Sequence, residues 1–241
     1  MNDAPIRFSR TALLCGEEAL RTMAEAKILI VGLGGVGGHA AENLARAGIG
    51  HLTLLDGDTV ELSNCNRQII ALSDTVGRSK AEVLAERCRQ IDPDGGFIPV
   101  NRFLRTPEEI SRLLETPFDY VIDAIDDVPV KIELIRQLKL RRIPFVSAMG
   151  AGGKTDPSRV TVADISRTSG CPLAKTVRKK LKELGIRQVR CVFSPETPKR
   201  SFEHKKIGSI SYMAAIFGCF CAAEAIRVLT GIDRGGETRR P

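Results

Sequence analysis

The sequence feature that most constrains the fold is a glycine-rich turn between a short apolar segment and a helical pattern. Lys27–Val31 reads KILIV, an apolar run typical of a buried strand. Three glycines with the spacing G-x-G-x-x-G follow it: Gly32, Gly34 and Gly37. Residues 36–47 have the apolar spacing of a helix, and His51–Leu55 (HLTLL) is typical of a second strand. This order predicts a βαβ unit, whose right-handed crossover belongs to a parallel sheet.

Strand and helix patterns continue to alternate along the chain. Helices are expected at 77–91, 107–114 and 128–140, and strands at 97–100, 120–123 and 143–147. This rhythm predicts an α/β fold with a Rossmann-like, doubly wound and mostly parallel sheet. After Gly153 it loosens, with strands expected at 160–163 and 189–193, a basic helix at 172–184, a polar loop at 194–206 and an apolar helix at 210–229.

These patterns indicate a single domain over residues 1–241. We expect a nucleotide-binding core at 6–153 and a smaller C-terminal, substrate-binding lobe at 154–230 that continues the same sheet. The last residues, 231–241, are expected to form a flexible tail.

Composition is that of a soluble globular protein that can bury a sizeable core, with 43% hydrophobic and 27% charged residues in 241. The sequence opens without a basic-then-apolar leader, and its longest uncharged run, 207–223, is shorter than the about 20 residues that span a bilayer. We therefore expect a buried helix there and no membrane partner. Seven cysteines without a C-x-x-C pair argue against a zinc site and favour a reduced, cytoplasmic location.

The net charge of +7 is unevenly distributed. Residues 171–241 hold 15 Lys and Arg against 6 Asp and Glu, a net +9, whereas residues 1–170 hold 21 against 23, a net −2. Such asymmetry fits either a polyanionic partner bound by the last third of the chain or a solvated basic surface. Charge alone leaves both interpretations open.

The glycine turn favours a bound nucleotide. Glycines let the backbone approach phosphates at a helix N-terminus, and Asp56, at the end of the second strand, can accept hydrogen bonds from ribose hydroxyls. On its own this pattern is typical of NAD or FAD binding, and a tight turn without a ligand is the alternative.

The residues after Asp56 fit a triphosphate better than a dinucleotide. Carboxylates at Asp58 and Glu61 are followed by side chains that could donate hydrogen bonds to phosphate: Asn64, Asn66, Arg67 and Lys80. Splitting a triphosphate at its α-phosphorus requires cations and a metal ion to absorb the developing charge. Asp126 and Asp127 follow a predicted strand, where either could hold Mg²⁺. Surface ion pairing is the alternative for Arg67 and Lys80.

The segment VGLGGVGGHAAENLARAGIGHLTLLDGDTVELSNCNRQI resembles the ThiF/MoeB family of ubiquitin-activating-enzyme-like adenylyltransferases. The similarity includes R-x-x-R at Arg7 and Arg10, D-x-D at Asp56 and Asp58, S-N-x-x-R-Q from Ser63 and V-G-x-x-K ending at Lys80. It extends to IDAIDD and to GSISYMAAIFGCFCAAEAIRVLTG near the end of the chain, so it covers most of the sequence.

This resemblance implies an ATP-dependent adenylation domain with Mg²⁺. Gly35 would approach the phosphates, Asp56 would bind the ribose, and Asp126 would coordinate the metal. Arg10 would reach the ATP of a partner subunit, which implies a homodimer. Four residues would carry catalysis: Arg10, Arg67, Lys80 and Asp126. The implied nucleotide-binding set is Gly32, Gly34, Gly35, Gly37, Asp56, Asp58, Ser63, Asn64, Asn66, Arg67, Lys80, Asp126 and Asp127.

Within that family, the chain is most similar to the threonylcarbamoyladenosine dehydratases of tRNA. The similarity rests on NCNRQI, VIDAIDD, MGAGGKTDPSRVTVADI and PLAKTVRKKLKELGI. Cys171 stands where that subgroup is expected to have aspartate, which puts any fixed role of the position in doubt. Cys65, between residues expected to contact phosphate, is expected to be passive. The implied reaction adenylates the threonyl carboxylate of threonylcarbamoyladenosine at position 37 and closes it into a ring with release of AMP and pyrophosphate.

Other functions stay open at this point. One is an adenylyltransferase for a small ubiquitin-like or sulfur-carrier protein, another an NAD-dependent oxidoreductase, and a third a non-catalytic nucleotide-binding scaffold. A sulfur-transfer partner and a monovalent cation (Na⁺ or K⁺) near the nucleotide are also open. A tRNA substrate would explain the basic last third, and with two tyrosines and no tryptophan we expect backbone contacts to dominate. The expected tRNA-binding residues are Lys175, Arg178, Lys179, Lys180, Lys182, Lys205 and Lys206.

Overall fold

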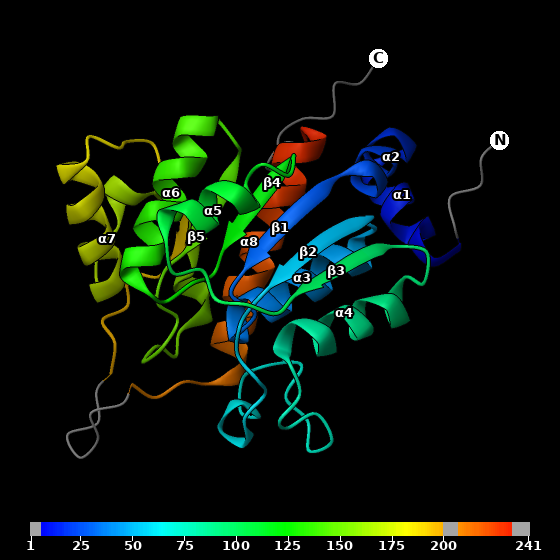
Figure 1. The fold of residues 1–241 in the computed structure, drawn as a ribbon, viewed down its shortest axis with the longest axis horizontal. Helices are drawn as coiled ribbons and strands as arrows, with labels where there is room; N and C mark the ends of the chain where they lie inside the picture. The colour runs from blue at the N-terminus through cyan, green and yellow to red at the C-terminus, as the bar shows by residue number, and fades with distance from the viewer. Residues whose placement is uncertain (1–5, 200–206, 233–241) are drawn as a thin grey trace.

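The computed structural model describes residues 6–199 and 207–232, which build a seven-stranded sheet covered by helices on both faces (Figure 1). The strand order is β3-β2-β1-β4-β5-β7-β6, and every neighbouring pair is parallel except β6 with β7. The strands are β1 (Lys27–Val31), β2 (His51–Leu55), β3 (Gly96–Val100), β4 (Tyr120–Asp123), β5 (Phe145–Ala148), β6 (Thr161–Asp164) and β7 (Arg190–Phe193). The predicted mostly parallel α/β fold, with the C-terminal strands continuing the sheet, is confirmed.

Alternation along β1 explains the two helical layers. Ile28 and Ile30 face one core, which includes residues of α1, α2, α3, α4 and α8, while Leu29 and Val31 face a second core with α5 and α6. A third core joins α6, α7 and β7. The helices are α1 (Ser9–Cys15), α2 (Glu17–Glu25), α3 (Gly35–Ala47), α4 (Lys80–Ile91), α5 (Pro107–Leu113), α6 (Val128–Arg141), α7 (Pro172–Glu183) and α8 (Ser211–Thr230).

Several predicted boundaries shift for local reasons. The helix expected from residue 77 begins at Lys80, because Gly77 has φ +88° and the Ser79 side chain caps the helix by accepting from the Glu82 amide. The strand expected from 143 begins at Phe145, because α6 ends in a left-handed residue, Arg142, and Pro144 follows. The short helices α1 and α2 were not predicted.

The long apolar helix α8 is the one helix in the described residues that is long and apolar enough to cross a membrane. In this structure it packs inside the domain, with Phe217 and Cys221 fully buried. Its contact with α3 is close: a Cβ added to Gly218 would lie 2.6 Å from the carbonyl oxygen of Val36. The predicted buried helix is therefore present, one residue displaced from its expected ends.

The strand order reverses beside β1, which makes a crevice at the carboxyl ends of β1 and β4. From β1 the chain moves outward to β2 and β3, and then returns to β4 on the other side. In open α/β sheets, such a switch point is where ligands bind. Figure 1 shows α1 and α2 beside the start of β1, at the opposite edge of the sheet.

Candidate nucleotide-binding site

A cavity of about 910 Å³ lies at this switch point. It is lined by the glycine turn, the residues after β2 and β4, and the segment that follows β3. The predicted nucleotide-binding residues that line it are Gly32, Gly34, Gly35, Asp56, Asp58, Asn64, Arg67, Lys80, Asp126 and Asp127. The fold thus brings residues up to 95 positions apart in the chain into one cavity, counted from Gly32 to Asp127.

Two glycines of the turn have different reasons to be glycine. Gly32 has φ +88°, and a Cβ there would lie 2.7 Å from the carbonyl oxygen of Ala124. At Gly34 the protein itself leaves room for a side chain, since the nearest atom to an added Cβ is Gln68 Nε2 at 3.7 Å. Gly34 is also the N-cap of α3 and forms no side-chain cap, so amides of the first turn are open to the cavity. This end of α3 is suited to an anion.

Asp56 is fixed by the backbone at the base of the cavity. Its Oδ2 accepts a hydrogen bond from the Leu33 amide at 2.7 Å, and its Oδ1 accepts one from the Asp58 amide at 2.8 Å. Each carboxylate oxygen can accept a second bond. The side chain therefore both holds the glycine turn and retains acceptor capacity toward a ligand.

The two predicted cations of the cavity, Lys80 and Arg67, differ in burial and in ion pairing. Lys80 is buried, and its Nζ lies 2.7 Å from Oδ2 of Asp58. The Arg67 guanidinium donates to the Ser63 carbonyl at 3.0 Å and to Asn66 Oδ1 at 2.9 Å. Throughout 6–199 and 207–232, Arg67 forms no ion pair, so its positive charge is oriented but not neutralised.

Three predicted residues do not line the cavity but contact residues that do. A Cβ on Gly37 would come within 1.8 Å of the Gly32 carbonyl oxygen, so this glycine lets α3 approach the turn. Ser63 and Asn66 provide the acceptors that orient Arg67. The amide of Asn66 also donates to the Ser209 carbonyl at 3.0 Å, which links the loop to the segment before α8.

The aspartates after β4 occupy the other side of the cavity above a buried ion pair. Asp127 caps α6, with Oδ1 accepting from the Val130 amide at 3.0 Å, whereas Asp126 is exposed to the cavity. Beneath them Lys131 Nζ lies 2.7 Å from Asp123 Oδ2, and the two side chains are fully buried. Ser147 donates to the same oxygen at 2.6 Å, and Asp123 Oδ1 accepts from the Ile125 amide at 3.1 Å. This network fixes the loop that carries Asp126.

Sequence reasoning missed two parts of the wall. Gln68 appeared only inside a motif, yet its side chain is buried, lines the cavity and leaves Oε1 without a hydrogen-bond partner in the part of the chain described. An unpaired buried acceptor is costly unless a ligand or water satisfies it. The segment after β3 contributes Phe103, 48% exposed, whose ring is stacked by the Arg105 guanidinium at 5.7 Å. No motif marks this segment.

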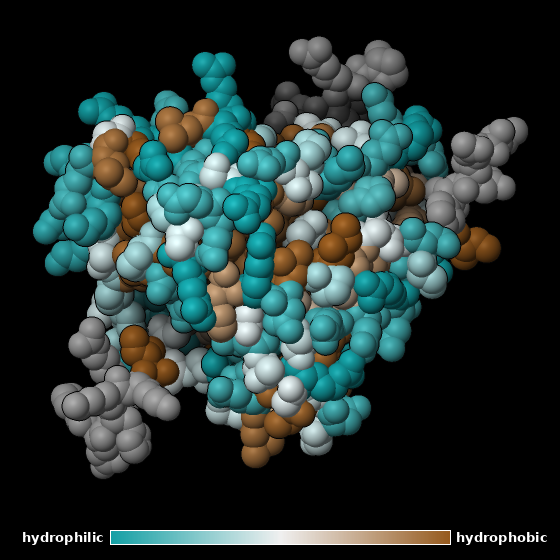
Figure 2. Space-filling model, viewed as in Figure 1, coloured by the Kyte–Doolittle hydropathy of each residue, from teal (hydrophilic) through white to brown (hydrophobic). Residues whose placement is uncertain are grey.

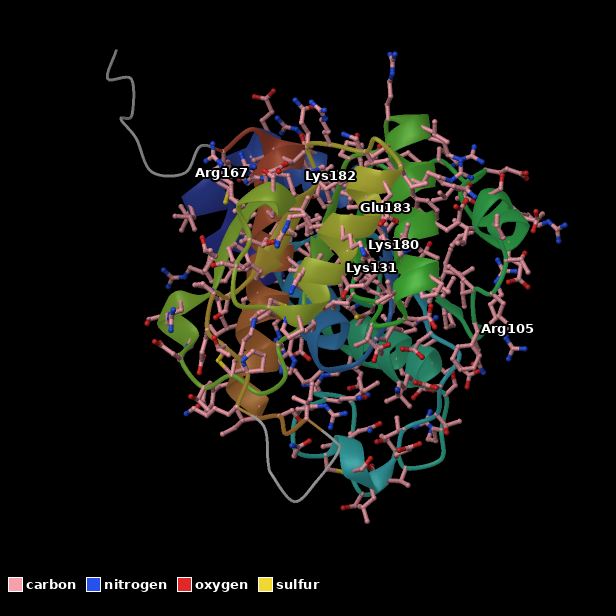
Figure 3. The ribbon with its side chains drawn as sticks, turned by 90° about the vertical axis from the view of Figure 1, so that its left-hand side faces the viewer. Arg105, Lys131, Arg167, Lys180, Lys182 and Glu183 are labelled. Carbon is pink, nitrogen blue, oxygen red and sulfur yellow. The ribbon has the colours of Figure 1, made fainter. Side chains whose placement is uncertain are left out.

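The other predicted functional residues lie outside this cavity. Arg10 is exposed on α1, near the amino end of β1, and does not line it. Lys175, Lys179, Lys180 and Lys182 are exposed along α7, as Figure 3 shows for the labelled Lys180 and Lys182. The guanidinium of Arg178 donates to the Thr168 carbonyl at 2.9 Å and is half-buried. Lys205 and Lys206 lie outside the described residues.

The candidate cysteine Cys171 is buried at the N-cap of α7. Near it is a lysine that no prediction singled out: Lys154, 2% exposed, donates to the Ser194 carbonyl at 2.9 Å. Burial lowers the pKa of Lys154, although the nearby Cys171 and Glu196 act in the opposite direction. Both groups belong to the packing of the C-terminal lobe.

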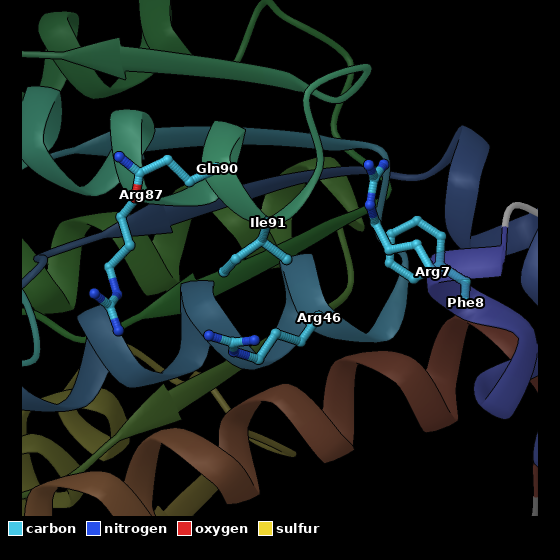
Figure 4. Close-up of a pocket in the computed structure, with 6 residues that line it drawn as sticks. All are labelled: Arg7, Phe8, Arg46, Arg87, Gln90 and Ile91. Atoms are coloured by element: carbon cyan, nitrogen blue, oxygen red, sulfur yellow. The ribbon is translucent and has the colours of Figure 1, made fainter.

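A second, smaller pocket of about 390 Å³ contains three arginines, Arg7, Arg46 and Arg87 (Figure 4). Each is already paired: Arg7 with Asp92 at 2.7 Å, and Arg46 and Arg87 with Glu42. Burial alone would raise the pKa of Glu42, but hydrogen bonds and charge from Arg87 and Arg46 lower it. The pocket is therefore an ion-pair network between helices rather than a site with spare charge.

Comparison with known proteins agrees with this geometry. The chain matches the ThiF family over residues 8–240. It is 41% identical over 248 residues to the tRNA threonylcarbamoyladenosine dehydratase of Escherichia coli (strain K12), with 92% of each chain covered. It is 43% identical over 193 residues to the tRNA threonylcarbamoyladenosine dehydratase of Bacillus subtilis (strain 168), covering 80% of this chain and 76% of that one.

Solved structures give the same result. The crystal structure of E. coli TcdA in complex with AMP matches with a TM-score of 0.89 and 42% identity, over 93% of this chain and 94% of that one. The complex of the same enzyme with ATP matches with a TM-score of 0.88. Because the family match spans nearly the whole sequence, and both relatives are more than 40% identical, the chain belongs to the ThiF family.

Proposed function

We propose that the protein is an ATP-dependent dehydratase that acts on threonylcarbamoyladenosine at position 37 of tRNA. The observation that carries the proposal is the single cavity in which the N-terminus of α3, Arg67, Lys80 and Asp126 meet. A triphosphate cleaved at its α-phosphorus needs this combination of amides, cations and a carboxylate for a metal. The relatives described above supply the substrate class.

The reaction proceeds in two steps that together remove one water. A threonyl carboxylate oxygen attacks the α-phosphorus of ATP, and pyrophosphate leaves. A nitrogen or oxygen atom of the carbamoyl group then attacks the activated carbonyl carbon and closes the ring. The bond from that carbon to the adenylate oxygen breaks, AMP leaves with the former carboxylate oxygen, and one N–H proton of the carbamoyl group is released. Both leaving groups are anionic phosphates, so fixed positive charge in the cavity lowers both barriers.

The side chains have separate parts in this scheme. Arg67, oriented by the Ser63 carbonyl and Asn66 and not neutralised, meets the charge that develops on pyrophosphate. Lys80, held by Asp58, supplies a second cation that is already desolvated. Asp56 accepts from the ribose hydroxyls, and Gln68 supplies its free acceptor to the same ligand.

Magnesium suits the carboxylate at Asp126. The described residues contain no group of three or more His, Cys, Asp or Glu side chains that would form a complete metal site. Mg²⁺ commonly uses only one or two protein carboxylates, together with phosphates and water, so Asp126 would hold the ion jointly with ATP. Bound in this way, Mg²⁺ would neutralise charge on the triphosphate.

A homodimer completes the proposal. Arg10 does not line the cavity of its own chain, and its helix α1 lies beside the start of β1 in Figure 1, so it would act in a partner's cavity. α1 and its flanking turn expose three large apolar side chains: Ile6 at 93%, Leu13 at 79% and Leu14 at 86%. Exposed apolar side chains gathered on one short segment are typical of an interface. Mixing inactive Arg10→Ala and Arg67→Ala proteins should restore activity through mixed dimers, and no recovery after subunit exchange would exclude the shared site.

The remaining components follow from the same scheme. All seven cysteines are free, which supports a reduced cytoplasm. Residues 6–153 would bind ATP and 154–230 the tRNA, with 231–241 as a tail outside the described range. A monovalent cation beside the triphosphate would add to the charge already supplied by Arg67 and Lys80, and dependence of turnover on K⁺ or Na⁺ at constant ionic strength tests for it.

Pyrophosphate release tests the reaction class directly. The protein should release pyrophosphate from Mg·ATP when tRNA bearing threonylcarbamoyladenosine is added, and should not do so with the same tRNA lacking the threonyl group. Release that depends instead on a small carrier protein with a Gly-Gly end would show that the carrier adenylyltransferase is the correct function.

A further inference from the structure

The C-terminal lobe contains a large basic cavity on the other edge of the sheet. It measures about 1070 Å³ and lies between the short helix at Ile165–Arg167, α7 and the segment leading into β7. Five cationic side chains line it: Arg167, Arg178, Lys182, Arg187 and Arg190. Within the part of the chain described, Asp164 is the one carboxylate in its wall. A cavity with this excess of positive charge is suited to a polyanion.

Most of this charge is available. Arg190 pairs with Glu224 at 2.8 Å, and Arg178 donates to Thr168. By contrast, neither Lys182 nor Arg187 forms an ion pair with any residue in 6–199 or 207–232, and both are exposed. Figure 3 shows Lys182 and Arg167 at the same end of the lobe, on separate elements.

The walls of this cavity suit oxyanions, and in the tRNA substrate of the proposed function that oxyanion is the backbone phosphate. Four of the five cations are arginines, whose planar guanidinium binds phosphate through two parallel hydrogen bonds. No aromatic side chain is among the described residues that line it, so bases would have nothing to stack on.

The basic surface continues along the sheet edge. Gln188 and Arg190 also line a neighbouring cavity of about 500 Å³, whose wall includes Lys139 and Arg142. Lys139 Nζ donates to the Gln188 carbonyl at 3.3 Å, which ties α6 to this edge. Figure 2 shows a mostly hydrophilic surface over the part of the molecule that carries α7.

Helix α7 runs from one side of the C-terminal lobe to the other. Its N-terminus lies beside the loop after β5, where a Cβ on Gly150 would be 3.6 Å from the Cys171 sulfur. Its other end reaches the basic cavity. A helix of 12 residues is about 18 Å long, so the basic cavity lies well away from the loop after β5.

We infer that this cavity binds backbone phosphates of the tRNA stem, at a distance from the nucleotide that reacts. The inference rests on the proposed function and adds a second, remote contact for the same substrate. It assigns binding to Arg167 and Arg187 in addition to the α7 residues. An acidic protein segment is the competing occupant.

The test uses two exposed arginines of the cavity and a matched pair elsewhere. The full-length double variant Arg167→Ala/Arg187→Ala is compared with Arg21→Ala/Arg112→Ala, which removes two exposed arginines that line neither cavity. The probes are an anticodon stem-loop with its full stem and one with the stem shortened to two base pairs. Affinity is measured over a range of salt concentrations, together with ATP affinity.

The cavity variant should bind the full stem-loop at least tenfold more weakly at 0.15 M salt, and its log–log salt slope should fall by about 2, one per lost phosphate contact. ATP affinity and the matched control should be unchanged. Shortening the stem should lower the affinity of the native protein for the stem-loop by a similar factor, and that of the variant by less than twofold. Equal losses for both proteins on shortening, or native affinity in the variant, would overturn the inference.

Two further outcomes separate this inference from the proposed function. If the native protein dehydrates modified tRNA but the cavity variant loses only its retention on polyglutamate, the function holds and the cavity takes an acidic protein instead. If the native protein neither binds the stem-loop nor releases pyrophosphate with modified tRNA, the proposed function itself is wrong, and the inference fails with it.

Discussion

The two edges of the sheet place positive charge in different ways. At the carboxyl edge, two of the four cations that line the cavity are held in place: Lys80 is buried against Asp58, and Arg67 is oriented by its own loop, whereas Arg102 and Arg105 are exposed. At the amino edge of the C-terminal lobe, five cations line the cavity, and none of them is buried. This difference teaches that a catalytic site depends on the position of each charged group, whereas a surface that binds a polyanion depends on the total charge of its groups.

Removing Arg67 should have the largest effect. Arg67→Ala should lower turnover by about 10³-fold, as expected for loss of a fixed group that stabilises transition-state charge. Cys65→Ser, two residues away and exposed, is the matched control and should keep native turnover. Steady-state pyrophosphate release measures both variants, and the reverse pattern would place the chemistry at the sulfur rather than at the guanidinium.

Breaking the buried ion pair below the Asp126 loop should be nearly as severe but should act on folding. Lys131→Met leaves Asp123 charged and fully buried, which should cost about 3–5 kcal/mol of unfolding free energy. Denaturant unfolding measures the loss. Lys179→Met, at an exposed position of α7, should change stability by less than about 0.5 kcal/mol. Similar losses for the two lysines would contradict the contrast between the edges.

The glycine turn offers a finer test, since two of its glycines should fail differently. Gly34→Ala has room within the protein, so the variant should fold normally but bind ATP about tenfold or more weakly, because the methyl group enters the ligand's space. Gly37→Ala would press against the Gly32 carbonyl and should lower the thermal midpoint instead. Calorimetry measures ATP binding and thermal unfolding measures stability, so together they distinguish the two variants. Normal ATP affinity in Gly34→Ala would show that the phosphates do not bind at this turn.

Charge reversal on the exposed face of α7 should have the mildest effect. Lys179→Glu/Lys180→Glu should weaken tRNA binding about tenfold at moderate salt while leaving ATP affinity unchanged. Lys180 already pairs with Glu183 at 3.2 Å, so Lys179 should account for most of the loss. Binding titrations with tRNA and with ATP measure the two effects, and unchanged tRNA affinity would make this face a solvated surface.

Local signals predicted the fold well, and they singled out residues that the fold brings into one cavity. β1, β2 and β4 have the predicted bounds, because short apolar runs flanked by glycine or aspartate fix both the type and the ends of a buried strand. Glycine spacing, Asp56 and Arg67 were identified because their chemistry depends on neighbours in sequence. Residues 205 and 206, predicted to bind tRNA, lie outside the described range and stay predictions.

What was missed depends on tertiary structure. Phe103 reaches the nucleotide cavity only because β3 lies beside β2, and no nearby motif indicates this. Gln68 is identified by an unpaired buried oxygen, a property of packing rather than of sequence. Likewise, Arg167 and Arg187 are isolated charges in the sequence and become part of one cavity only when β6 pairs with β7.

The most direct test of the account is mass analysis of nucleosides from tRNA carrying threonylcarbamoyladenosine after incubation with the protein and Mg·ATP. We predict that this nucleoside loses one water, about 18 Da, with one AMP and one pyrophosphate formed for each nucleoside converted, since ring closure expels the adenylate. An unchanged nucleoside mass with a protein that still binds ATP and tRNA would contradict it.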